Sequence, residues 1–118
     1  MFPPDEVGEA GFLAGLRRCG SEPVVRNGVV VFTVVPVGGA HAGRDVETGV
    51  ASTELASWPS CPPHWVHLPQ LVSIAITNAQ VSPIPGWLMH SRQIVRWGNA
   101  ADPAQAWLAH VRAVLEEA

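Results

Sequence analysis

The feature of this sequence that most restricts its fold is the segment Trp58-Pro59-Ser60-Cys61-Pro62-Pro63, which contains three prolines. Each proline fixes its own φ angle and lacks a backbone N–H donor, so the segment is excluded from a helix interior and from a central strand. We therefore predict a rigid, ordered corner, the proline tract, between the extended segments on its two sides.

Branched side chains predict strands before this corner. The runs Val24-Val25 and Val29 to Val35 flank Asn27-Gly28, a dipeptide that favours the positive φ angles of a tight hairpin. A glycine-rich turn at 38–43 follows, and the segment from Asp45 to Leu55 then alternates loosely between apolar and polar residues. This alternation is typical of an antiparallel strand with one packed face and one wet face.

After the corner, Trp65 to Leu68 resumes an extended stretch, and the apolar run Leu71 to Thr77 is predicted to close the sheet. From Asn78 to Asn99 the pattern is irregular, since Pro83 and the Pro85-Gly86 pair interrupt it. We predict that this segment is a long loop that carries function, because loops on a rigid scaffold commonly do.

Helices are predicted at both ends. The first helix is predicted to start at Asp5 and Glu6 and to end at Gly20. In the second helix, Asp102 is the predicted N-cap, Pro103 takes the first helical position and Gln105 stands at the capping-box position. The second helix has one apolar face, made of Trp107, Leu108, Val111, Val114 and Leu115. The sequence thus predicts a single α+β domain over residues 1–118, with about four strands in an antiparallel meander and the C-terminal helix packed on the sheet.

Charge and hydropathy exclude several classes of function. The formal net charge is −3, and the seven basic residues, all arginine, are scattered rather than gathered in a stripe, so no nucleic-acid partner is predicted. The longest apolar run, Val29 to Val35, is far shorter than the roughly 20 residues that span a bilayer. No membrane partner is expected. The N-terminal residues show neither a basic nor an apolar signal region, which favours a cytoplasmic location.

The cysteines and histidines do not predict a bound metal. Cys19 and Cys61 form no CxxC pair and cannot make a disulfide framework, so they are expected to be reduced thiols that pack or are incidental. His64 and His67 are three residues apart, which places them on opposite faces of a strand. Without a series of further ligands, neither a metal site nor a cofactor is predicted.

The order of these elements and the proline tract resemble the ubiquitin-conjugating (UBC-like) superfamily, in which a Tyr-Pro-x-x-Pro-Pro signature joins the third and fourth strands. Trp58 stands at the tyrosine position, Pro59, Pro62 and Pro63 match the prolines, and Trp97 before the final helix matches the downstream part. The resemblance covers nearly the whole chain and is closest to bacterial ubiquitin-conjugating-like proteins. It implies a ubiquitin-like protein and an activating enzyme as partners.

The chain also departs from that family. Members carry a His-Pro-Asn element and then a catalytic cysteine between the proline corner and the final helix, whereas this chain has neither there and no cysteine after Cys61. Either the domain is a non-catalytic variant or another nucleophile has taken the role. Ser91 precedes Trp97 at a position close to that of the family's cysteine, while Ser82, followed by Pro83, is interpreted as a turn residue.

A serine hydroxyl needs a neighbouring base at neutral pH, and the candidates are His90, His64 and His67. Adjacent residues of an extended segment point apart, so a histidine from the strand after the corner is at least as good a candidate as His90. Arg92 and Asn78 are the candidates for binding the oxyanion or the donor's tail. The alternative is that His90-Ser91-Arg92 is simply a polar loop.

We expect a bacterial ubiquitin-conjugating-like protein that accepts a ubiquitin-like protein and transfers it, with an oxyester on Ser91 as the possible intermediate. One alternative is an inactive conjugating-fold module that binds a ubiquitin-like protein or activating enzyme as a scaffold. Another is an unrelated small α+β domain in which the proline tract arose by chance.

Overall fold

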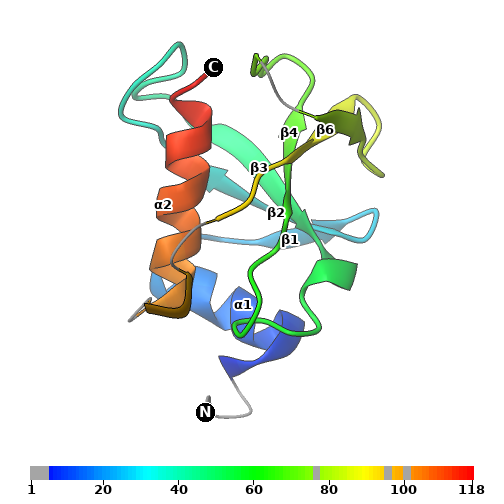
Figure 1. The fold of residues 1–118 in the computed structure, drawn as a ribbon, viewed down its shortest axis with the longest axis vertical. Coiled ribbons are helices and arrows are strands. Elements are labelled where there is room, and N and C mark those ends of the chain that lie inside the picture. The colour runs from blue at the N-terminus through cyan, green and yellow to red at the C-terminus, as the bar shows by residue number, and fades with distance from the viewer. Residues whose placement is uncertain (1–5, 76–77, 95–96, 100–101) are drawn as a thin grey trace.

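The computed structural model describes residues 6–75, 78–94, 97–99 and 102–118 (Figure 1). Its six strands form one antiparallel sheet in the order β1-β2-β3-β4-β6-β5, and two α-helices pack on one face of it. The elements are α1 (Gly8–Arg18), β1 (Val24–Arg26), β2 (Val29–Val34), β3 (Val46–Ala51), η2 (Ser52–Glu54), β4 (Trp65–Pro69), β5 (Ala79–Val81), β6 (Trp87–Ser91), η3 (Trp97–Asn99) and α2 (Pro103–Leu115). The α+β class is therefore confirmed.

The first hairpin forms as its sequence predicts. Asn27 and Gly28 have φ angles of 52° and 75°, so the two residues between β1 and β2 take the left-handed conformation that a tight hairpin turn requires. Arg26 lies opposite Val29 in the register. This register places alternate valines of β2 on opposite faces of the sheet.

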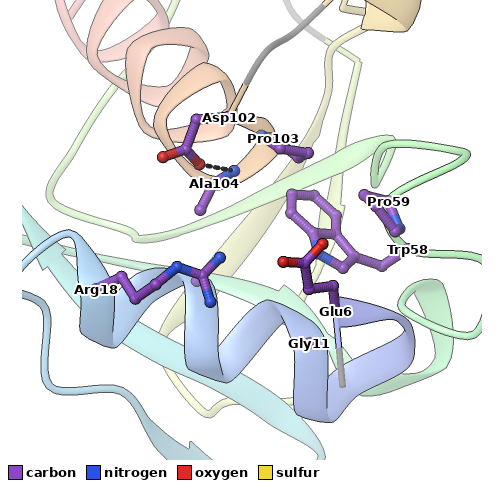
Figure 2. Close-up of a pocket in the computed structure, with 9 residues that line it drawn as sticks. Glu6, Gly11, Arg18, Trp58, Pro59, Asp102, Pro103 and Ala104 are labelled. Carbon is purple, nitrogen blue, oxygen red and sulfur yellow. Dashed lines mark hydrogen bonds between the residues drawn. The ribbon is translucent and has the colours of Figure 1, made fainter. Parts of the chain in front are cut away.

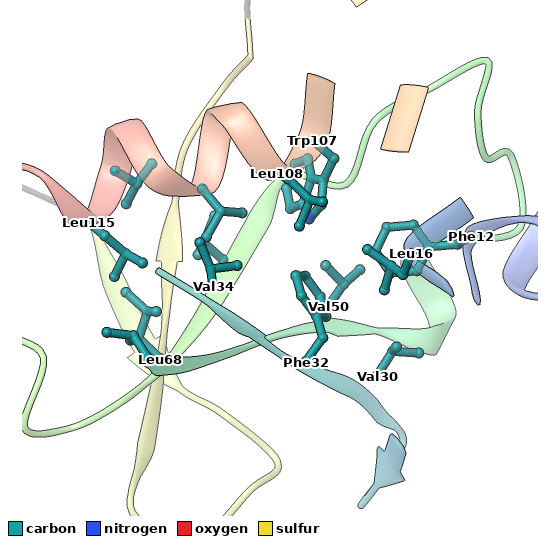
Figure 3. Close-up of a cluster of buried hydrophobic side chains, with 14 of the residues drawn as sticks. Phe12, Leu16, Val30, Phe32, Val34, Val50, Leu68, Trp107, Leu108 and Leu115 are labelled. Atoms are coloured by element: carbon teal, nitrogen blue, oxygen red, sulfur yellow. The ribbon is translucent and has the colours of Figure 1, made fainter. Parts of the chain in front are cut away.

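The main core lies between the helices and one face of the sheet (Figure 3). The sheet contributes alternate residues of its strands, so Val30, Phe32 and Val34 of β2 meet the helices while their neighbours face the other side. The predicted apolar face of α2 is confirmed, since its five members are all buried: Trp107, Leu108, Val111, Val114 and Leu115.

The helix ends follow from local chemistry. The carboxylate of Asp102 accepts hydrogen bonds from the backbone amides of Ala104 and Gln105, and Pro103 begins α2, as predicted. Helix α1 begins at Gly8, and Asp5, the predicted start, lies outside the described residues. In the described part of the chain, neither helix is long and apolar enough to cross a membrane.

The proline tract joins β3 to β4, which are neighbours in the sheet. The Trp58 side chain is buried against Phe12 of α1, with ring centroids 4.8 Å apart, and the peptide bond to Pro59 is cis. The indole N–H of Trp97 donates to the carbonyl of Pro59 across 2.6 Å, and its ring lies 5.3 Å from that of Trp58. The corner is thereby tied both to α1 and to the segment that precedes α2.

Two predictions about the second half of the chain are wrong. Residues 70–75 form turns and bends rather than a strand, because β4 already ends at Pro69 and the amide of Val72 turns back to its carbonyl; Ile76 and Thr77 lie outside the described residues. The segment 78–99, predicted as a loop, instead contains β5 and β6. Its prolines lie in the turn between these strands, where Trp87 N–H donates to the carbonyl of Ile84. The sheet therefore has six strands rather than about four.

The turn between β5 and β6 folds over the second face of the sheet, the face away from the helices. Ile84 and Trp87 form a small buried cluster there with Val29 and Val31 of β2. The side-chain amide of Asn27 donates to the carbonyl of Pro83 across 3.2 Å. We call this side of the sheet the open face.

Candidate active site

Ser91 is the last residue of β6 and lies opposite Trp65 of β4 in the register. The Nε2 atom of His64, the residue immediately before β4, makes a short hydrogen-bond contact with the Ser91 hydroxyl oxygen. The two residues are 27 positions apart in sequence, and the β4–β6 pairing brings them together. The predicted nucleophile and one of its predicted bases are thus adjacent.

The backbone of His64 is held on both sides. Its amide donates to the Oε1 atom of Glu54 in η2 at 2.8 Å, and its carbonyl accepts from the Arg92 amide at 3.0 Å. Its ring lies against that of Trp65, with centroids 5.3 Å apart. These contacts fix where the imidazole leaves the main chain, next to the end of β6.

The structure does not pair His90 with Ser91. Successive residues of β6 point to opposite faces, so the His90 side chain lies on the helix-covered side and is only 3% exposed. Burial, and after it the charge of Arg92, lowers the pKa of His90. In this geometry the imidazole that reaches the serine is that of His64. The role of His90 as a catalytic base stays a prediction.

The backbone amide of Ser91 and the guanidinium of Arg92 are both hydrogen-bonded within the fold. The carbonyl of Asn78 accepts the Ser91 amide at 2.9 Å, and the Arg92 guanidinium pairs with the carboxylate of Glu117 at the end of α2. The predicted roles of Asn78 and Arg92 in binding an oxyanion or a tail stay predictions.

A second histidine–serine pair was not foreseen from the sequence. His67 Nδ1 and Ser82 Oγ are 2.8 Å apart, both side chains are buried, and the same hydroxyl accepts the Ile84 amide at 3.3 Å. The last contact agrees with the interpretation of Ser82 as a turn residue. Burial, and after it the neighbouring His90, lowers the pKa of His67 to about 4, so this imidazole is neutral at pH 7. No signal in the sequence predicts the pair, because it depends on the unpredicted β5–β6 hairpin.

A groove of about 540 Å³ lies on the open face, next to the His64–Ser91 pair. Its lining comes from β4, β6, the start of the β5–β6 turn and the segment around η2: Ala51, Thr53, Glu54, Trp65, His67, Val81, Ser82, Pro83 and Met89. Two of these residues reach the pair directly, since Trp65 packs against the His64 ring and Glu54 accepts its amide. Pockets of this size accommodate small ligands or parts of larger ones.

A smaller hollow of about 250 Å³ lies between α1, the start of α2 and the proline tract (Figure 2). Glu6, Arg18 and Asp102 supply its charges, and Asp102 already caps α2. A Cβ atom on Gly15 would lie 2.8 Å from that of Ala104, so the two helices meet closely at its edge. We assign this hollow to helix packing.

The two cysteines form no disulfide. Cys61 is exposed in the proline tract, whereas Cys19 is partly buried and its thiol pKa is raised by burial and then by Asp102. A raised pKa disfavours the reactive thiolate of Cys19. Among the residues that the structure describes, no three histidine, cysteine or acidic side chains gather as metal ligands.

Comparisons with known proteins do not identify a family for this chain. No family model, no curated protein and no solved structure matches it. The function must therefore be argued from the site itself. Its chemistry is that of a serine hydroxyl with an imidazole in position to take its proton.

Proposed function

We propose that this protein is an acyl carrier and transferase of the ubiquitin-conjugating-like kind, in which Ser91 receives the terminal carboxyl group of a ubiquitin-like protein as an oxyester. The observation that carries the proposal is the contact between His64 Nε2 and the Ser91 hydroxyl. A hydroxyl is a weak nucleophile at neutral pH, and a base within hydrogen-bond reach is the usual means of activating it.

In each half of the reaction, His64 takes up one proton and returns it. The Ser91 oxygen attacks the carbonyl carbon of a thioester donor while its proton passes to His64 Nε2. The C–S bond then breaks, and His64 returns that proton to the departing thiolate. In the second half, an amine attacks the Ser91 ester, the C–O bond breaks, and the amine's proton passes through His64 to the Ser91 oxygen.

The arrangement around the pair supports a conjugating-enzyme-like assignment. The proline tract links two neighbouring strands, and Trp97 ties that corner to the segment before the C-terminal helix. Ser91 lies between the corner and that helix in sequence, and its hydroxyl lies beside the residue that directly follows the tract. An activating enzyme that forms the thioester donor is the partner this chemistry needs.

The test uses a synthetic peptide with a C-terminal thioester as the acyl donor. We expect a protein adduct, seen by intact mass, that survives reductant but is cleaved by alkaline hydroxylamine, as an oxyester is. The adduct should map to Ser91 and disappear in Ser91→Ala. Ser60→Ala, which removes an exposed serine of the proline tract, is the matched control and should keep it. Persistence of the adduct in Ser91→Ala would overturn the proposal.

A specific observation favours a second candidate, a non-covalent scaffold for a ubiquitin-like protein or its activating enzyme. The Ser91 amide is bonded to Asn78 and the Arg92 guanidinium to Glu117, so two groups suited to stabilising an oxyanion are engaged elsewhere. Absence of any adduct with the peptide thioester, in wild type as in Ser91→Ala, would favour this candidate over the first.

A further inference from the structure

The groove on the open face continues from the candidate nucleophile. Trp65 lies opposite Ser91 in the β4–β6 register, and Met89, two residues before Ser91 on the same face of β6, lines the groove beside it. The His64 ring packs on Trp65 at the same end. A group whose carbonyl carbon is placed at the Ser91 hydroxyl can therefore extend along β6 into the groove.

The side chains of the groove are suited to an uncharged, apolar occupant. Trp65 and Met89 supply apolar surface, and Ala51 and Pro83 extend that surface at the sides. Two of its polar members, His67 and Ser82, are hydrogen-bonded to each other and are almost fully buried, while Thr53 is exposed at the rim. The neutral imidazole of His67 adds no charge at pH 7.

The lining also includes Glu54, which carries a negative charge at pH 7. Its carboxylate accepts the His64 amide, so Glu54 both lines the groove and contacts a member of the histidine–serine pair. A second negative charge placed in the groove would be repelled by it and would also lose its own hydration. The lining therefore disfavours an anionic acyl group.

We propose that the groove binds the part of the acyl donor next to its reacting carbonyl, and that this part is apolar and uncharged. The inference rests on the proposed function, because it takes Ser91 as the acyl acceptor. It adds the class of acyl group, which is one with an apolar, uncharged side chain close to its terminal carboxyl group.

The test is a series of 4-nitrophenyl esters: acetate, butyrate, hexanoate and the anionic hemisuccinate. In each reaction the Ser91 oxygen attacks the carbonyl carbon, the proton passes to His64 and 4-nitrophenolate leaves. The rate with the intact protein, less that of Ser91→Ala, is divided by the rate of the same ester with free imidazole to remove intrinsic reactivity. We expect about a 15-fold increase from acetate to butyrate, which differ by two methylenes, as each buried methylene contributes about fourfold. The hemisuccinate should be slower than butyrate.

A variant that fills the groove with a larger side chain tests whether the groove causes the dependence on acyl chain length. Thr53 is exposed and lines the groove, so Thr53→Phe is expected to lower the butyrate-to-acetate ratio towards one. Thr33→Phe makes the same replacement at an exposed threonine on β2, whose register partner is Glu47 at the far end of β3 from Ala51. This control should keep the wild-type ratio.

The outcomes separate the two proposals. A normalised rate that depends on Ser91 but does not change along the series, or a hemisuccinate rate equal to that of butyrate, overturns the apolar-groove inference and leaves the acyl-transfer function standing. A rate that is the same in wild type and Ser91→Ala for every ester overturns both.

Discussion

At the scale of single residues, the candidate site depends on which side chain reaches Ser91. The sequence places His90 next to the serine, yet strand alternation turns the His90 side chain to the helix-covered face. His64 reaches the hydroxyl instead, held by a hydrogen bond from its amide to Glu54. Proximity in sequence is therefore the weaker guide here, and the pairing of β4 with β6 decides the geometry.

Glu54 is expected to act as a positioning residue. Removing its carboxylate in Glu54→Ala should lower the Ser91 acylation rate about tenfold, since a small misplacement of a catalytic group is costly. Glu54→Gln keeps an oxygen acceptor for the His64 amide and should recover most of the rate. Rates are measured with 4-nitrophenyl acetate, and equal losses in the two variants would show that the charge, rather than the hydrogen bond, is what matters.

His67 makes stability depend on pH. Its pKa is depressed to about 4 in the folded protein, while in the unfolded chain it has its ordinary value of 6.5. Between these two pH values the unfolded state binds more protons than the folded state. The contribution of the neutral His67 to the free energy of unfolding is therefore complete above pH 6.5 and is lost as pH falls towards 4. At pH 5 the resulting decrease in the free energy of unfolding is about 2 kcal/mol.

The measurement for His67 is urea unfolding at pH 7 and pH 5. Acidic residues also titrate in this range, so the comparison is between wild type and His67→Gln, which has no imidazole to protonate. We expect the free energy of unfolding to fall more for wild type by about 2 kcal/mol. An equal fall in both proteins would refute the assignment.

At the scale of the elements, the sequence predicted correctly those features that depend on residues within one short segment. Asn27-Gly28 predicted the first hairpin, Asp102-Pro103 predicted the start of α2, and the proline tract predicted a corner. The β5–β6 hairpin was missed because Pro83 and Pro85 interrupt the period, although they occupy only its turn. Without β6 in place, the sequence named His64 only as one of three candidate bases for Ser91, and it did not predict the His67–Ser82 pair.

The contact between α1 and α2 requires a glycine. A Cβ at Gly15 would lie 2.8 Å from the Ala104 Cβ, closer than such atoms pack. Gly15→Ala should therefore lower the free energy of unfolding by about 1 to 2 kcal/mol, even though alanine is the better helix former. Urea denaturation measures this change, and a variant as stable as wild type would mean that the helices separate easily.

At the scale of the whole molecule, the hydrogen bond from Trp97 to the Pro59 carbonyl links the proline tract to the segment before α2. Trp97→Phe keeps an aromatic ring beside Trp58 but removes the donor to the Pro59 carbonyl. We expect a loss of about 1 kcal/mol in unfolding free energy, measured by urea titration. Trp65→Phe provides a comparison, and an equal or larger loss there would show that ring size accounts for the effect.

The whole fold also explains why the candidate nucleophile is placed at a sheet end. The corner directs the chain into β4 with His64 immediately before the strand, and β6 runs antiparallel to β4, so its last residue Ser91 lies beside His64. The open-face groove adjoins the same end of both strands. One arrangement of strands thus provides the base, the nucleophile and a surface for the acyl group.

The most direct test of the account is covalent labelling by a fluorophosphonate, which reacts with an activated serine as fluoride leaves and the proton passes to the base. We predict a single adduct that maps to Ser91, with a labelling rate at least about 100-fold lower in His64→Gln, since a positioned base contributes at least that factor. Labelling at another residue, or an equal rate in wild type and His64→Gln, would contradict it.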